Sequence, residues 1–225
     1  MGNTRRILER MGVFNMSEKL GFKVVVLNEE GKERWKKISK SETHWLRGFY
    51  ISKVFLEADK VVQTCCLKTH RFGGYFTLSL KNSVGLIADK IPGGLYNYMW
   101  ELHSSPHQRL MVAEINKFYN VDLIVMDAMK AFINQGPERG DTVEPNLILA
   151  GKDRVAIDAV GVAILRSYGS TQNVMKKRIF SLDQIHRAAE LEVGVESASD
   201  IKLTPINNES QADADKIESI LKSQG

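Results

Sequence analysis

The chain has 225 residues, 43% hydrophobic and 26% charged, which is a normal globular composition, and its net charge of +4 is spread along the sequence. Dispersed basic residues without an aromatic or zinc-finger signature argue against a nucleic-acid partner. Cys65 and Cys66 are the only cysteines, too few for a disulfide framework, a zinc ribbon or a four-ligand cluster, and no apolar run reaches membrane-spanning length. We therefore expect a cytoplasmic protein without a membrane partner, with a homodimer as the default oligomer.

The first quarter of the chain predicts one helix and two strands. Residues 4–11 have the apolar spacing of a short helix, and FKVVVL at 22–27 is typical of a buried strand. Residues 45–54 mix aromatic and charged side chains, as an edge strand does. The lysine-rich segment between these two strands is predicted to be a loop or an edge hairpin.

From residue 60 onwards, apolar strands alternate with amphipathic helices. Strands are predicted at 60–66, 121–126, 147–150 and 201–203, and helices at 105–118, 153–168 and 182–191. The alternation favours an α/β fold, a layered, largely parallel or mixed sheet with helices on both faces. We expect one α/β domain over residues 1–205 and a peripheral polar helix over 206–225.

Charged side chains follow three of the predicted strands. Lys68 and His70 follow the first strand, Asp127 the second and Asp153 the third. Ligands of parallel sheets bind beyond the carboxyl ends of the strands, so we predict that these groups meet at one edge. The alternative for Asp153, which we favour for that residue alone, is a helix N-cap, and for Asp127 a turn former is equally suitable.

Asp158 lies within RVAIDAVGVAIL, a helix that is apolar nearly all round and is predicted to be buried. A buried carboxylate needs a partner, which a lysine or backbone amides near the strand ends could supply. The equal alternative places Asp158 on the exposed edge of the first helical turn.

The stretch CLKTHRFGGYFTLSLKNSVGL combines basic and amide groups with glycines and aromatic residues. Lys81 is a point charge for an anion, Asn82 can orient it, and Gly73 and Gly74 allow close approach of the backbone. His70 can bind a metal or transfer a proton. Together they predict a pocket for a small anionic molecule, although each alone suits a solvated lysine or a satisfied core histidine.

Two further histidines, His103 and His107, surround the start of a predicted helix. They could face the same pocket as His70, but surface positions at the helix start are the better expectation.

The motifs LKTH, SLKNSVGL, DLIVMDAM, GPERG and ILAGKDRVAIDAVGVAIL occur in this order, and the chain resembles the domain-of-unknown-function family 362 over about residues 56–203. Members of that family often carry a ferredoxin-type cluster domain. The cysteines of such a domain are missing here, so no iron–sulfur cluster is expected in this chain. The lysine–proline–asparagine motif that usually precedes the core is also missing, which implies a shortened member or a start further upstream.

The segment HRFGGYFTLSLKNSVG is similar in rhythm to the lactate racemase family, in which a histidine, a glycine–tyrosine turn and a lysine anchor a nickel–pincer nucleotide. His70, Tyr75 and Lys81 occupy the corresponding places, at different spacing. This resemblance implies a pocket for an anion or a metal cofactor as a class.

Two functions follow as hypotheses. In the first, the chain is an enzyme with His70, Lys81 and Asp127 as catalytic groups, and Lys68, Lys81, Asn82, Gly73, Gly74, Asp153 and Asp158 bind a carboxylate or phosphate. A divalent metal held by His70, Asp127 and Asp153 would be its cofactor. In the second, the chain is a non-catalytic ligand-binding or accessory module for a redox or iron–sulfur partner.

Overall fold

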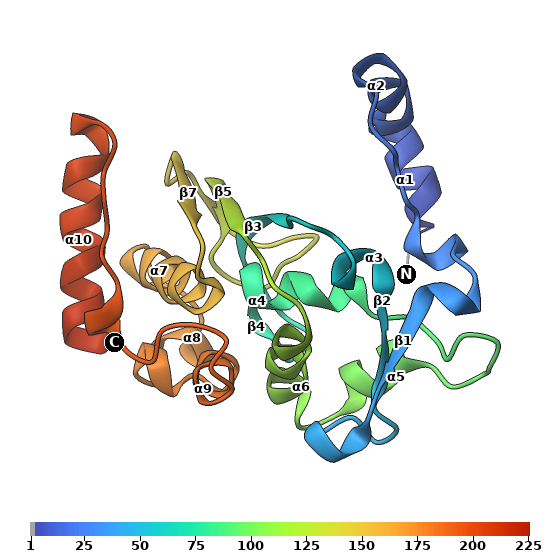
Figure 1. Ribbon diagram of the computed structural model, residues 1–225. Coiled ribbons are helices and arrows are strands. Elements are labelled where there is room, and N and C mark those ends of the chain that lie inside the picture. The colour runs from blue at the N-terminus through green and yellow to red at the C-terminus, as the bar shows by residue number, and fades with distance from the viewer. Residues whose placement is uncertain (1–2) are drawn as a thin grey trace.

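A five-stranded mixed sheet lies at the centre of the computed structural model, which describes residues 3–225 (Figure 1). Strand β3 pairs in parallel with β5, and β4 pairs antiparallel with the outer side of β3. Both β6 and β7 pair antiparallel with β5. The strands are β3 (Val62–His70), β4 (Tyr75–Thr77), β5 (Leu123–Phe132), β6 (Thr142–Val143) and β7 (Leu147–Gly151). The predicted α/β class with a mixed sheet is confirmed.

The direction of β7 differs from the parallel arrangement on which the predicted site depended. Gly151, at the end of β7, lies opposite Ile124, near the start of β5. The chain turns back after β5 through a short connection that contains β6, so β7 returns antiparallel instead of crossing over a helix. The residues that follow β7 therefore lie at the end of the sheet where β3 and β5 begin. The predicted site needs them at the other end, where β3 finishes.

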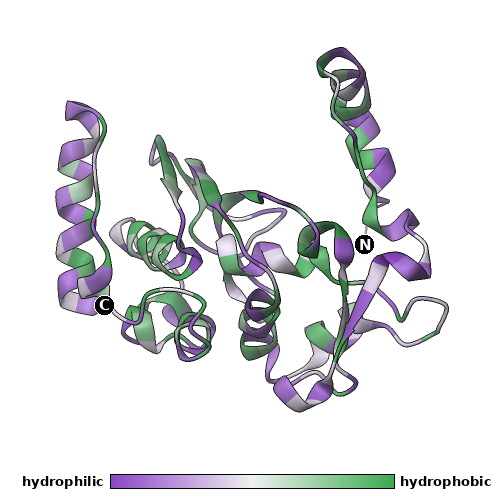
Figure 2. Cartoon of the chain, viewed as in Figure 1, coloured by the Kyte–Doolittle hydropathy of each residue, from purple (hydrophilic) through white to green (hydrophobic). Residues whose placement is uncertain are grey.

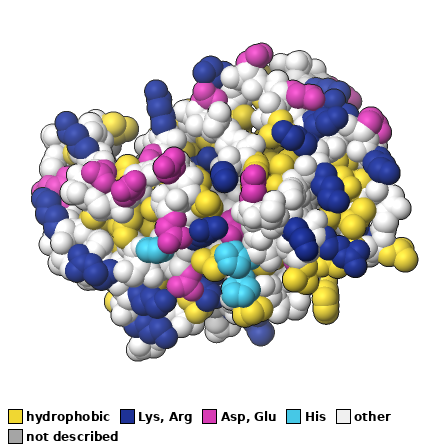
Figure 3. All heavy atoms as spheres, turned by 60° about the horizontal axis from the view of Figure 1, so that its bottom comes forward, with side chains coloured by type: hydrophobic (Ala, Val, Ile, Leu, Met, Phe, Trp, Pro, Cys, Tyr) yellow, Lys and Arg dark blue, Asp and Glu magenta, His cyan; other side chains and the backbone are white. Residues whose placement is uncertain are grey.

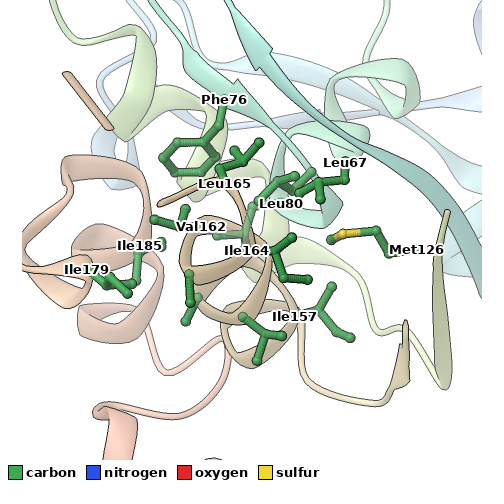
Figure 4. Close-up of a cluster of buried hydrophobic side chains, with 14 of the residues drawn as sticks. Leu67, Phe76, Leu80, Met126, Ile157, Val162, Ile164, Leu165, Ile179 and Ile185 are labelled. Carbon is green, nitrogen blue, oxygen red and sulfur yellow. The ribbon is translucent and has the colours of Figure 1, made fainter. Parts of the chain in front are cut away.

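Helix α7 (Arg154–Ser167) forms the centre of the main core, as its apolar sequence predicts. Its side chains pack against Leu67, Phe76 and Met126 of the sheet and against later helices (Figure 4). A Cβ atom at Gly161 would lie only 2.9 Å from Leu78 Cδ1, so the missing side chain lets the helix approach the sheet closely. Helices α4 (Ser79–Asn82), α8 (Gln172–Met175) and α9 (Asp183–Glu190) pack against it, and α6 (Gln108–Ile115) packs against α4 and α9.

The opposite face of the sheet is open, whereas helices were expected on both faces. Val62, Leu123, Met129 and Ile148 on this face are between 38% and 61% exposed. The alternation of burial along β5 follows directly, because successive side chains point to opposite sides of a strand.

A second, aromatic core joins the small hairpin of β1 (Trp35–Ile38) and β2 (Phe49–Ser52) to helices α3 (Lys53–Leu56), α5 (Tyr98–Ser104) and α6. Trp45 lies at its centre, with ring centroids 5.4 Å from Phe49 and 6.0 Å from Tyr98. The predicted edge strand at 45–54 corresponds to β2. The predicted strand at 22–27 is wrong, because this segment has no strand pairing and only Val26 in it is buried.

The two ends of the chain form helices on opposite sides of the molecule (Figure 1). Helices α1 (Thr4–Arg10) and α2 (Val13–Leu20) project from the body without a buried residue, and the hydropathy colouring of Figure 2 shows both hydrophobic and hydrophilic positions along them. Helix α10 (Asn208–Gln224) packs along α7 through Ala214, Ile217 and Leu221. The predicted strand at 201–203 is absent from the described chain.

Short 3₁₀ helices complete the described structure at Leu27–Glu29, Lys32–Arg34, Lys40–Glu42, Ser83–Leu86, Asn116–Phe118, Ile179–Ser181 and Ala198–Asp200. Within residues 3–225, none of the helices combines the length and apolar character needed to cross a bilayer.

Candidate functional site

The hairpin of β3 and β4 places basic and hydroxyl groups on one face. Lys68 pairs with Thr77, and His70 pairs with Tyr75. Directly opposite residues of an antiparallel pair share a face, with Cβ atoms close enough for contact. The intervening pair of Thr69 and Phe76 is buried on the other face. Two of the predicted site residues, Lys68 and His70, are thus brought together by local strand geometry.

The turn between the strands brings Lys81 next to His70. A Cβ atom at Gly74 would lie 3.3 Å from His70 Nδ1 and 3.6 Å from Lys81 Cε, so Gly74 leaves a gap of methyl size between the two side chains. At Gly73 the backbone has φ of +80°, and a Cβ atom would lie 2.7 Å from Gln108 Oε1. Glycine is required at this second position, both for its left-handed conformation and for the close approach.

Lys81 lies in α4, partly buried, and the only hydrogen bond of its side chain in the described chain is a long one. Its Nζ donates to Thr77 Oγ1 at 3.4 Å, and no carboxylate of residues 3–225 forms an ion pair with it. Burial, together with the charge of Lys68, lowers the pKa of Lys81 to about 8. The structure therefore holds a lysine whose cationic form lacks a counter-ion.

His70 is buried and its Nδ1 has no hydrogen-bond partner in the described structure. Burial lowers the pKa of His70 to about 3, and the positive charges of Lys81, His103, Lys68 and Arg71 act in the same direction. The imidazole is therefore neutral at physiological pH, and its unpartnered Nδ1 is available to a bound molecule as a hydrogen-bond donor or acceptor, depending on the tautomer.

Further polar groups reach the site from distant segments, and the sequence reasoning missed them. Arg109 donates to Gly73 O at 2.9 Å, lies over the Tyr75 ring at 4.3 Å, and pairs with Asp183 at 2.8 Å. Gln108 is buried and its Nε2 has no partner in the described structure. No local pattern marks these two residues, because their contacts with the turn span more than 30 positions in the chain.

A cavity of about 210 Å³ adjoins this cluster at the end of β3. Its lining consists of Thr69, His70, Arg71, Gly73, Tyr75, Gln135, Thr171 and Asn173. The loop after β5 contributes to this end of the sheet, because Arg71 N donates to Gly136 O at 3.3 Å and Arg71 pairs with Glu138 at 2.6 Å. The cavity is therefore bordered by several polar side chains, including the unpartnered imidazole.

Asp127 lies away from the cluster. Strand β5 does not end at Met126 but continues to Phe132, so Asp127 lies within the strand, opposite Cys66 and Ile148. Its side chain is on the open face and accepts a hydrogen bond from Met129 N at 2.9 Å. The expectation that Asp127 lies at the strand end, beside His70, is wrong.

Asp153 lies at the opposite end of the sheet from His70, because β7 runs antiparallel to β5 and finishes beside the start of β5. It caps α7 by accepting from Ala156 N and also accepts from Val195 N, each at 2.8 Å. The N-cap alternative is therefore the correct one for this residue. Within residues 3–225, no three histidine, cysteine or acidic side chains are placed to hold a metal ion, so the predicted ligands His70, Asp127 and Asp153 do not assemble.

Asn82 and Asp158 have structural contacts. Asn82 is exposed and its Nδ2 donates to Thr64 O at 2.7 Å. Asp158 is completely buried; it accepts from Leu80 N at 3.2 Å and from Gln184 Nε2 at 3.3 Å. Of the two alternatives for Asp158, burial against backbone amides is correct, and the contact with α4 supports the helix that carries Lys81.

Three of the other four histidines lie in two places, and the exposed His186 pairs with Glu190 at 3.5 Å. His103 is close enough for its charge to act on His70, and its Nδ1 contacts Met99 O at 2.6 Å. His44 and His107 lie with ring centroids 4.9 Å apart, and His44 Nδ1 contacts the buried Glu114 carboxylate at 2.5 Å. Figure 3, in which the bottom of the view in Figure 1 comes forward, shows histidine side chains among acidic and basic groups.

Comparison with known proteins identifies a family and no closer relative. The family model described as "Domain of unknown function (DUF362)" matches residues 1–163, which is more than half of the chain. No curated protein matches significantly, and neither does any solved structure.

Proposed function

This chain belongs to the DUF362 family, and from the geometry of its own residues we propose that it binds a small anionic molecule, a carboxylate or a phosphate, at the end of the β3–β4 hairpin. The observation that carries the proposal is Lys81, a partly buried lysine without an acidic partner in the described chain, next to the unpartnered Nδ1 of His70.

The energetics of the cluster favour an anion. Lys68, Lys81 and Arg71 all act on His70 with positive charge, and of these only Arg71 has a carboxylate partner within residues 3–225, Glu138. Charges in a partly dry site repel one another strongly and are costly unless paired. A bound carboxylate or phosphate would supply the missing negative charge and accept hydrogen bonds from the free amines.

The same geometry is suited to proton transfer. A neutral imidazole beside an anion subsite can remove or return a proton, provided that the reacting atom comes within hydrogen-bond reach. His70 is therefore the proposed acid–base group, with Lys68 and Lys81 as anion-binding groups. Asp127, which lies opposite Cys66 within β5 and accepts a hydrogen bond from Met129 N, has no part in this proposal.

A second candidate is the accessory module without turnover, and the open sheet face favours it. Val62 and Leu123 are exposed and lie opposite each other on this face, and exposed apolar pairs of this kind can contact another layer or a partner. The two candidates share the anion site and differ in chemistry. Turnover of a bound ligand, lost in His70→Gln, would support the enzyme.

We expect Lys81→Met to reduce anion affinity at least tenfold, because it removes the charge without a large change in volume. Isothermal titration with phosphate and oxalate measures the effect, and the midpoint of urea unfolding tests whether the fold is intact. Lys130→Met, at a lysine that is 62% exposed and pairs with Glu144, is the matched control and should bind like the wild type. Equal affinity of the wild type and Lys81→Met would refute the site.

Anion affinity should also depend on pH. Lys81 must be protonated to attract an anion, and its pKa of about 8 means that it loses its charge as the pH rises through that value. Oxalate remains an anion over this pH range. Its affinity should therefore be highest below pH 7 and fall steeply between pH 7 and 9. A flat profile in this range, with binding present, would remove Lys81 from the site.

A further inference from the structure

We infer that Lys81 Nζ forms an imine with the carbonyl carbon of a small 2-oxo acid whose carboxylate is held by the surrounding basic groups. This inference rests on the proposed anion site and goes beyond it, because it assigns covalent chemistry to one of the binding residues.

The surroundings of Lys81 leave its amine free to react. Its one hydrogen bond in the described chain, to the Thr77 hydroxyl, is long, and no ion pair within residues 3–225 holds it in the ammonium form. Nearby Lys68 and partial burial both favour the neutral amine, which lowers the pKa of Lys81 to about 8. Lysines desolvated beside another cation are the ones that act as nucleophiles towards carbonyl groups.

His70 is placed to transfer the protons that imine formation needs. Its Nδ1 and Lys81 Cε both border the gap at Gly74, so the imidazole and the amine side chain are immediate neighbours. Nδ1 has no partner in the described structure, and the ring is neutral because its pKa is lowered to about 3. A neutral imidazole in this position can accept a proton from one atom and return it to another.

The reaction is balanced without a cofactor. The nitrogen lone pair forms the bond to the carbonyl carbon while the carbonyl electrons move to its oxygen, and one proton passes from the nitrogen through His70 to that oxygen. The second proton of the nitrogen follows the same route as the carbinolamine expels its oxygen as water and the carbon–nitrogen double bond forms. The products are one imine and one water, with no oxidation or reduction.

Size and charge select the substrate class. The adjoining cavity of about 210 Å³ is smaller than the roughly 300–1,000 Å³ of sites for drug-sized ligands, so it suits a molecule of a few carbon atoms. Arg71 and His70 both line this cavity, and Lys81 and His70 both border Gly74. A carbonyl next to a carboxylate suits this arrangement, because the carboxylate would pair with Arg71 while the carbonyl extends past His70 towards Lys81.

The test is reductive trapping with pyruvate. The intact chain is incubated with pyruvate and sodium borohydride, and peptide mass spectrometry locates the reduced adduct. We expect the adduct on Lys81 to exceed that on Lys68 and Lys130 by at least tenfold, and Lys81→Arg to lack it. Labelling spread evenly over the lysines, or no labelling of Lys81, would overturn the inference.

A parallel titration with oxalate, which cannot form an imine, separates the inference from the proposed function. Oxalate binding without trapping at Lys81 would leave the anion site intact and eliminate the imine. If neither oxalate binding nor trapping at Lys81 is observed, the anion site and the imine are both eliminated. Lys81→Arg keeps the positive charge, so it should retain measurable oxalate binding while its trapping is lost.

Discussion

Asp158→Asn is expected to remove a pH-dependent loss of stability that the wild-type chain shows between pH 3.8 and about 8. Burial raises the pKa of Asp158 from 3.8 to about 8, only partly offset by hydrogen bonds from the amides of Leu80 and Ser79, by Gln184 and by the charge of Arg154. Because the pKa is higher in the folded chain, the folded state binds more protons than the unfolded chain throughout this range.

The sign of the effect follows from this difference. The contribution of Asp158 to the free energy of unfolding is greatest below pH 3.8. It falls as the pH rises and becomes constant above about pH 8. At about 1.4 kcal/mol for each pH unit, the total loss has an upper limit of about 6 kcal/mol. An asparagine side chain at this position can still accept from Leu80 N but has no charge, so this component of the pH dependence should disappear.

Urea unfolding at a series of pH values across and above this range measures the effect. The Asp158→Asn variant should exceed the wild type in stability at the alkaline end. Asp127→Asn, a change of the same kind on the exposed face, is the control and should retain the wild-type profile. Parallel profiles for wild type and Asp158→Asn would show that the buried carboxyl does not titrate in this range.

Arg154→Met should lower the free energy of unfolding by about 3 kcal/mol or more, because it leaves several buried acceptors without a donor. Arg154 is 6% exposed and donates to Asn116 Oδ1 at 3.1 Å, Asn116 O at 3.0 Å and Tyr119 O at 3.1 Å. Its guanidinium also lies 4.6 Å from the centre of the Tyr119 ring. These contacts join the start of α7 to the segment after α6.

Two variants make this prediction specific. Arg154→Lys keeps the charge but cannot donate to all of these acceptors at once, so its loss of stability should be smaller than that of Arg154→Met. Arg139→Met, at an exposed arginine, should change stability by less than about 0.5 kcal/mol. A loss below about 1 kcal/mol for Arg154→Met, measured by urea unfolding, would contradict the proposed role of this network.

The part of the candidate site that was predictable from sequence is local. Lys68 and His70 are two positions apart on one strand, and a glycine turn returns the chain so that Lys81 follows within one short helix. Over such a distance, strand alternation and turn geometry limit where side chains can point. For Asp158, a helix that is apolar nearly all round made burial one of two equal expectations, and the structure decides for burial.

Contacts between distant segments were not predictable in this way. Apolar runs identify the strands but not their direction. Because β7 runs antiparallel to β5, Asp153 lies at the opposite end of the sheet from His70. Likewise, Arg109 and Gln108 reach the turn only because α6 packs beside it.

The sequence by itself therefore determined the α/β class, the apolar elements of the main core and the basic cluster along one hairpin. Only the tertiary structure decided which acids stay away from that cluster, and so left Lys81 without an acidic partner in the described chain. The physical reason is that local propensities act over a few residues, whereas strand direction and helix docking depend on packing across the whole core.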